Sequence, residues 1–270
     1  MSPNKPSYGK VDRDYGMRMF TTPPEEDGPV WMVNFMKYRE EATYADGTKG
    51  VSGKEADDKY APTEILHEIG AEVPFFGDVV LQLAGNDVKW DRIGVVKYPT
   101  RASFLGMQNR KDFQDKHEHK EAGMEFTFVI GCQPNKLSPS LRVPFESWDS
   151  FEHAPTEEDG PVMVVHLLKF VEGGREGPME EYQNKAIKVA QKHGGGAAAM
   201  FNVEGTIMGD GRQWDECRFV SYPSLRSFMA VVQDPDRLEA QNGPRTAAIA
   251  DTYTVVVRPR NDTFTTHGAI

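Results

Sequence analysis

The chain has 270 residues, of which 39% are hydrophobic, 10% aromatic and 27% charged, a composition typical of one large or two ordinary soluble domains. Its formal net charge of −10 leaves no basic surplus to neutralise phosphates, which weighs against nucleic acid and anionic membrane surfaces as partners. Two cysteines without CxxC spacing indicate neither disulfides nor a metal site, and with no long apolar run or signal peptide we expect a cytoplasmic protein.

Strands and helices are predicted to alternate in the same order in both halves of the chain. In the first half, apolar runs and helical periodicity predict strand 29–38, helix 55–70, strand 73–85, strand 89–98, helix 100–120 and strand 124–131. In the second half they predict strand 161–170, helix 178–195, strand 198–209, strand 213–222, helix 224–233 and strand 252–259.

The two halves are internal repeats. EEDGPVWMVNFMKY at 25–38 matches EEDGPVMVVHLLKF at 157–170, and KWDRIGVVKYPTRASF from Lys89 matches QWDECRFVSYPSLRSF from Gln213. Two collinear blocks indicate a duplication. The predicted division is an N-terminal extension at 1–24, a first repeat at 25–134, a linker at 135–156, a second repeat at 157–260 and a C-terminal tail at 261–270.

Each repeat has the βαββαβ order of a ferredoxin-like unit. Such a unit has helices on one face of an antiparallel sheet, so the other face must be buried by something else. We therefore predict an α+β fold in which two fused ferredoxin-like repeats place their sheets face to face, as an intramolecular dimeric α+β barrel. A further homodimer of this fused pair is possible.

Both halves resemble domain-of-unknown-function family 1330, in the dimeric α+β barrel superfamily. The resemblance rests on PV-x-M-x-N-x-x-K-[YF] and on Trp-Asp followed by Tyr-Pro and Phe. It implies the barrel fold, within a superfamily of cofactor-independent monooxygenases, isomerases, dehydratases, haem enzymes and simple binders. It also implies a role for a His followed by a basic residue, which His119-Lys120 matches and Pro244-Arg245 does not.

Period-two alternation divides each strand into two faces. One face of the third strands mixes aromatic and charged residues, which a sealed core would not tolerate unpaired. We assign that face to the barrel interior, and with it Asn34 and His166, which occupy equivalent positions of the two first strands. The interior residues of the third strands are Trp90, Arg92, Gly94, Val96 and Tyr98, and Trp214, Glu216, Arg218, Val220 and Tyr222.

These residue types suggest a binding pocket. His166 is the candidate for proton transfer, because its ordinary pKa lies near neutrality. Arg92 and Arg218 would hold an anion, and Asn34 would polarise an oxyanion. The remaining substrate-binding candidates are Glu216, Tyr98, Tyr222, Trp90 and Trp214.

Structural explanations compete with these roles. His166 is equally explained as a core histidine satisfied by Glu216 or a backbone carbonyl. The arginines are equally explained by internal ion pairs such as Arg218 with Glu216. Asp91 and Asp215 of the Trp-Asp pairs would cap local backbone.

The function predicted from these residues is a cofactor-independent enzyme that transfers a proton on a small, partly apolar anionic or carbonyl compound, as an isomerase, cyclase, dehydratase or lyase. No metal site is expected. The alternatives are a non-catalytic small-molecule binding protein and a cofactor-free monooxygenase of a phenolic substrate.

Overall fold

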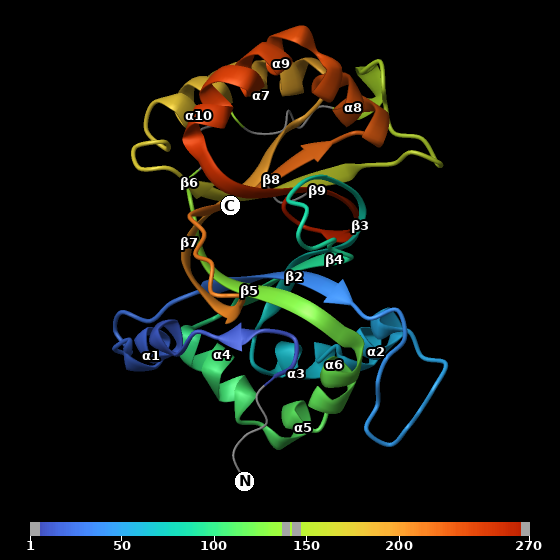
Figure 1. Ribbon diagram of the computed structural model, residues 1–270, viewed down its shortest axis with the longest axis vertical. Coiled ribbons are helices and arrows are strands. Elements are labelled where there is room, and N and C mark those ends of the chain that lie inside the picture. Colours follow the sequence, from blue (N-terminus) through green and yellow to red (C-terminus); the bar gives the residue numbers. More distant parts are fainter. Residues whose placement is uncertain (1–5, 137–140, 142–146, 266–270) are drawn as a thin grey trace. The chain divides into compact units, whose positions relative to one another are not determined.

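The chain folds into two compact units, each built from three stretches of the sequence. The computed structural model describes residues 6–136, 141 and 147–265. Unit 1 comprises residues 1–76, 88–133 and 203–213, and unit 2 comprises residues 77–87, 134–202 and 214–270 (Figure 1). Parts of the predicted linker 135–156 and tail 261–270 lie outside the described residues, and the division into repeats at 25–134 and 157–260 stays a prediction.

The elements of the first half have the predicted order, with two additions from the N-terminal extension. They are β1 (Lys10–Val11), α1 (Arg13–Thr21), β2 (Val30–Tyr38), α2 (Gly53–Tyr60), α3 (Thr63–Glu68), β3 (Glu72–Ala84), β4 (Arg92–Tyr98), α4 (Arg101–Gln108), α5 (Lys111–Gln114), α6 (His117–Gly123) and β5 (Met124–Pro134). In unit 1, β2 pairs antiparallel with β4 and β5, and β1 pairs with the end of β7.

The second half repeats this order and adds a helical segment before its last strand. Its elements are a 3₁₀ turn (Trp148–Ser150), β6 (Val162–Phe170), α7 (Pro178–Lys192), β7 (Gly196–Gly209), β8 (Glu216–Tyr222), α8 (Leu225–Gln233), α9 (Pro235–Ala240), the π-helix η3 (Gln241–Arg245), α10 (Thr246–Ala248) and β9 (Ile249–Asp262). In unit 2, β6 pairs antiparallel with β8 and β9, and β8 also pairs with β7.

Two predicted helices are interrupted. The helix expected at 55–70 ends at Tyr60 and resumes at Thr63, because Pro62 has no N–H to donate to the preceding turn. The helix expected at 100–120 is three short helices, α4 to α6. Among the described residues, no helix is both long and apolar enough to cross a membrane.

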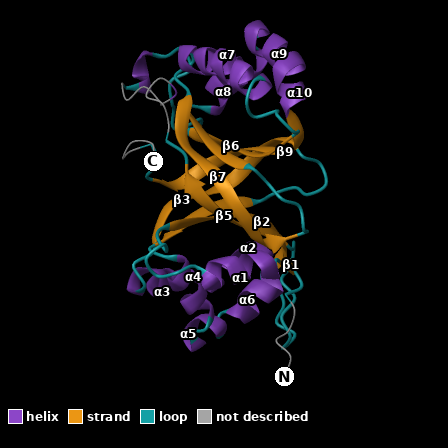
Figure 2. Ribbon diagram, turned by 90° about the vertical axis from the view of Figure 1, so that its left-hand side faces the viewer, coloured by secondary structure: helices purple, strands orange, loops and turns teal. Residues whose placement is uncertain are grey.

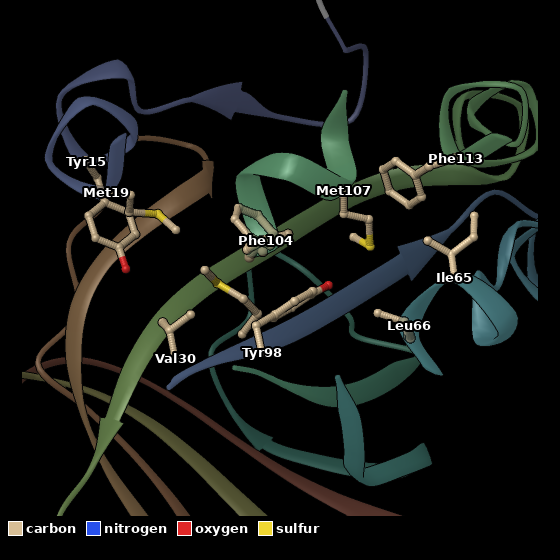
Figure 3. Close-up of a cluster of buried hydrophobic side chains, with 11 residues drawn as sticks. Tyr15, Met19, Val30, Ile65, Leu66, Tyr98, Phe104, Met107 and Phe113 are labelled. Atoms are coloured by element: carbon tan, nitrogen blue, oxygen red, sulfur yellow. The ribbon is translucent and has the colours of Figure 1, made fainter. Parts of the chain in front are cut away.

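In each unit the helices cover one face of the strands (Figure 2). The core of unit 1 lies there, where Val30, Met32 and Tyr98 of the sheet pack against residues of α1, α3, α4 and α5 (Figure 3). In unit 2, Val164 and Tyr222 pack in the same way against α7 and α8.

The repeated EEDGPV motif has a structural role in both units. Asp27 accepts hydrogen bonds from two backbone N–H groups at the start of α4, at 2.9 and 3.0 Å. Asp159 accepts two at the start of α8, at 2.9 and 3.1 Å. Each carboxylate therefore satisfies two donors that a helix N-terminus leaves free, and it complements the helix dipole.

The repeated Trp-Asp pair also has a structural role, as predicted. Asp91 accepts the backbone N–H of Tyr38 at 2.8 Å, and Asp215 accepts that of Phe170 at 2.7 Å. Both bonds lie where the register of the strand pair shifts, so each carboxylate replaces a partner that the irregular ladder lacks.

The predicted orientation of the strand faces is wrong. Asn34 lies two residues from Met32 and His166 two residues from Val164, so both share the face covered by the helices. Side chains assigned to the helix side, such as Phe35, lie on the other face and are fully buried. The mixed polar face does indicate a pocket, but alternation within a strand cannot tell which layer covers that face. The opposite face is the fully buried one at its apolar centre, which includes Phe35, Ile93 and Val95.

Candidate functional site

A pocket lies in unit 2 between the sheet and helix α7, with a volume of about 100 Å³. Most of its wall is apolar, and its polar groups are concentrated on a few side chains. The lining residues are Leu141, His166, Leu168, Met179, Tyr182, Gln183, Ala186, Ile187, Ala190, Ala197, Met200, Arg218, Val220, Tyr222 and Arg245. An apolar cavity with a few convergent polar groups is the usual form of a small-molecule site.

His166 lies in the sheet at the base of this pocket. On β6 it is paired with Arg218 of β8 and with Thr254 of β9. Its Nδ1 is 3.1 Å from the Thr254 hydroxyl, whereas its Nε2 has no hydrogen-bond partner among the described residues. Burial, and next the charges of Arg245, Arg218 and Arg237, hold the pKa of His166 well below its ordinary value. The imidazole is therefore neutral at neutral pH, with Nδ1 fixed and Nε2 available.

Arg218 belongs to a network of two arginines and one carboxylate. Glu216 is 3% exposed. Its Oε1 lies 2.6 Å from Arg175, and its Oε2 lies 2.5 Å from Arg218. The predicted structural explanation for Arg218 is thus confirmed in part, since Glu216 pairs with it, while Arg218 still lines the pocket beside His166.

Arg245 reaches the pocket from the π-helix η3 (Gln241–Arg245), a segment that contains Pro244. π-helical turns are rare and are frequently found at functional sites. The guanidinium of Arg245 lies 5.9 Å from the ring centre of Tyr182. Burial lowers its pKa, and no carboxylate in the described part of the chain forms an ion pair with it.

The equivalent positions of unit 1 do not reproduce this arrangement. Asn34 is paired with Gly94, not with an arginine, and its Nδ2 donates to the carbonyl of Met32 at 3.0 Å. One amide N–H of Asn34 is therefore bonded within its own strand, two residues away. The predicted oxyanion role of Asn34 has no support in these contacts.

Arg92 is an internal structural cation. It is fully buried, lies 3.2 Å from Asp57 and 2.7 Å from Asp58, and its guanidinium stands over the rings of Tyr38 and Phe76. The two carboxylates of α2 and the two rings account for its position. Its predicted anion-holding role is replaced by the ion-pair explanation, because both carboxylates come from the neighbouring helix.

The remaining candidates lie elsewhere. His119 contacts Tyr44, with its Nδ1 2.9 Å from the hydroxyl, and is part of unit 1. Tyr98 is a core residue of unit 1, whereas Tyr222 lines the pocket. Trp90 packs on Phe35.

Trp214 packs on Tyr253, which is paired with Leu167 and so lies on the face opposite His166. Both tryptophans were expected on the same face as the tyrosines, in the barrel interior. They lie on the other face because each precedes its strand, where the alternation does not yet apply.

Sequence reasoning missed three residues of the site, Arg245, Tyr182 and Thr254. Asp234 followed by Pro235 is the start signal of α9, and it would have indicated a helical segment leading to Arg245. Tyr182 and Thr254 are ordinary residues of a helix and a strand and have no such signal. Among the described residues, no group of three or more His, Cys, Asp or Glu could hold a metal ion.

No family model and no curated protein matches the chain, but solved structures do. An anthrone oxidase-like protein is 11% identical, with a TM-score of 0.50 over 88% of this chain and 95% of that one. The RPA0582 protein of unknown function from Rhodopseudomonas palustris is 25% identical, with a TM-score of 0.42 over 48% and 99%. A chlorite dismutase variant from Candidatus Nitrospira defluvii is 11% identical, with a TM-score of 0.47 over 90% and 94%. The first likeness shows a shared mixed α/β fold.

Proposed function

We propose that the chain is an enzyme that transfers a proton on a small, partly apolar anionic or carbonyl compound bound in the pocket of unit 2. The observation that carries the proposal is a neutral imidazole beside two guanidinium groups in an apolar-walled cavity. His166 would accept the proton, and Arg218 and Arg245 would hold the negative charge. The resemblance of the repeats to domain-of-unknown-function family 1330 stays part of this proposal.

The chemistry follows from the contacts of His166. Thr254 fixes Nδ1, so Nε2 is the atom that would exchange a proton with a bound compound. Burial raises the pKa of Tyr222, so its hydroxyl stays protonated at neutral pH and would only donate or accept a hydrogen bond. Removal of a proton next to a carbonyl creates an enolate, whose charge the neighbouring guanidinium groups would stabilise. Because the same imidazole could return the proton at another carbon, isomerisation suits the site best.

The test is proton exchange in D₂O. The wild-type protein should accelerate deuterium incorporation next to the carbonyl of 2-oxobutanoate, and proton NMR measures this incorporation. His166→Gln should abolish the acceleration while the probe still binds, and His119→Gln should leave it unchanged. Equal exchange in wild type and His166→Gln would remove the proton-transfer role.

The alternatives give different results in the same series. A probe that binds and is recovered without exchange would favour a binding protein. Oxygen consumption with small phenols would favour the monooxygenase.

A further inference from the structure

The described carboxylates balance the positive charge of the pocket only in part. Arg175 and Arg218 share the single carboxylate of Glu216. Arg245 has no ion-pair partner among the described residues, and Arg237 donates to the carbonyl of Val232 at 3.2 Å. Since burial lowers the pKa of Arg245, its charge is held in a poorly solvated place. A bound anion would offset that cost.

The lining arginines that have no ion-pair partner in the described part of the chain indicate the charge of the ligand. Of the two arginines that line the pocket, Arg218 is already bonded through Nε and Nη2 to Glu216, at 2.6 and 2.5 Å. Arg245 is left to bind a ligand. A guanidinium fork matches one planar carboxylate through two parallel hydrogen bonds. This arrangement favours a single carboxylate over a dianion.

The volume and the wall indicate the rest of the ligand. A cavity of about 100 Å³ accommodates roughly eight water-sized atoms. The wall opposite the sheet consists of Met179, Ala186, Ile187 and Ala190 of α7, with the ring of Tyr182 beside Arg245. Gln183 is the one amide that α7 adds to this wall. Such a wall suits a compact aliphatic or aromatic body and offers few partners for hydroxyl-rich compounds.

We propose that the pocket binds a small monocarboxylate with a compact apolar body, and that Arg245 is the residue that recognises its carboxylate. This inference rests on the proposed function only for the choice of pocket. It assigns the anion-binding role to a residue of the π-helical turn, in a segment outside the repeated motifs.

The experiment compares benzoate with benzamide, which has the same shape and no charge, by isothermal titration calorimetry. Wild type should bind benzoate at least tenfold more tightly than benzamide. Arg245→Gln should reduce benzoate affinity tenfold or more and leave benzamide affinity unchanged, and Arg245→Lys should have an intermediate effect. Lys185→Gln is the matched control, since it removes the same charge from the exposed side of α7, and it should change neither affinity.

Three outcomes would overturn the inference: no benzoate binding at millimolar concentration, equal binding of benzoate and benzamide, or equal benzoate affinities in Arg245→Gln and Lys185→Gln. Thermal unfolding of each variant shows whether it is folded. If Arg245→Gln does not fold, Arg245→Lys, which keeps the positive charge but not the guanidinium fork, tests the same role through its reduced benzoate affinity. His166→Gln separates the two proposals. If it keeps the Arg245-dependent preference for benzoate but wild type shows no proton exchange, the ligand assignment stands and the enzymatic role fails.

Discussion

Replacing Glu216 by Gln should destabilise unit 2 while leaving its ligand pocket functional. The carboxylate is 3% exposed and holds Arg175 and Arg218 at 2.5 to 2.6 Å. Gln keeps the shape but has one acceptor oxygen, so one guanidinium loses its partner. A hydrogen bond to a charged group contributes about 1.5–3 kcal/mol, and breaking a buried pair costs about 3–5 kcal/mol. Since Arg175 is 40% exposed and can be hydrated, we expect a loss of about 3 kcal/mol.

The measurement is urea unfolding followed by tryptophan fluorescence, with Trp90 in unit 1 and Trp214 in unit 2 as reporters. If the units unfold separately, the transition of unit 2 should move. Asp58→Asn is the control, because Asp58 is 53% exposed and Arg92 keeps Asp57; it should cost less than about 1 kcal/mol. A loss below 1 kcal/mol for Glu216→Gln would refute the reasoning. Benzoate binding should be retained or strengthened, since a negative charge is removed beside the pocket.

Four further outcomes are expected. Asp27→Ala and Asp159→Ala should each cost about 1–2 kcal/mol in chemical unfolding, because each removes a helix cap; a cost in only one unit would contradict equivalent roles. Because the folded-state pKa of His166 is depressed, the unfolded chain binds the proton first as pH falls below about 6.5, so stability should fall there by at most about 1.4 kcal/mol per pH unit. The urea midpoint of His166→Gln should therefore drop less than that of wild type between pH 7.5 and 5.5, and equal drops would exclude the effect. Arg92→Gln should cost about 3–5 kcal/mol in urea unfolding, and wherever the variant folds its benzoate affinity should equal that of wild type. His119→Ala should change the thermal midpoint little, because it removes a single part-buried hydrogen bond to the Tyr44 hydroxyl. It should leave benzoate affinity unchanged, because His119 belongs to unit 1 and the pocket lies in unit 2.

The candidate site shows why a correct pattern can be assigned to the wrong layer. The sequence identifies His166, Arg218 and Tyr222 as residues of one face, and all three line one pocket. Alternation is a property of a single strand, however, and the identity of the covering layer depends on how helices and sheets pack. Asn34 shows the same limit, because its repeat position suggests a role, while the hydrogen bond of its amide to Met32 depends on the folded strand.

The sequence by itself determined the order of the elements, the repeated motifs of the two halves and the capping roles of Asp91 and Asp215, whereas the contacts of Asp27 and Asp159 with helix starts came from the structure. These features depend on local periodicity and on short polar contacts that recur with the motif. Only the tertiary structure decided that Arg92 is neutralised by α2 while Arg245 is left with no ion-pair partner among the described residues. Ion pairs between distant segments have no signature in one sequence, since any carboxylate of the chain is a potential partner until folding excludes all but a few.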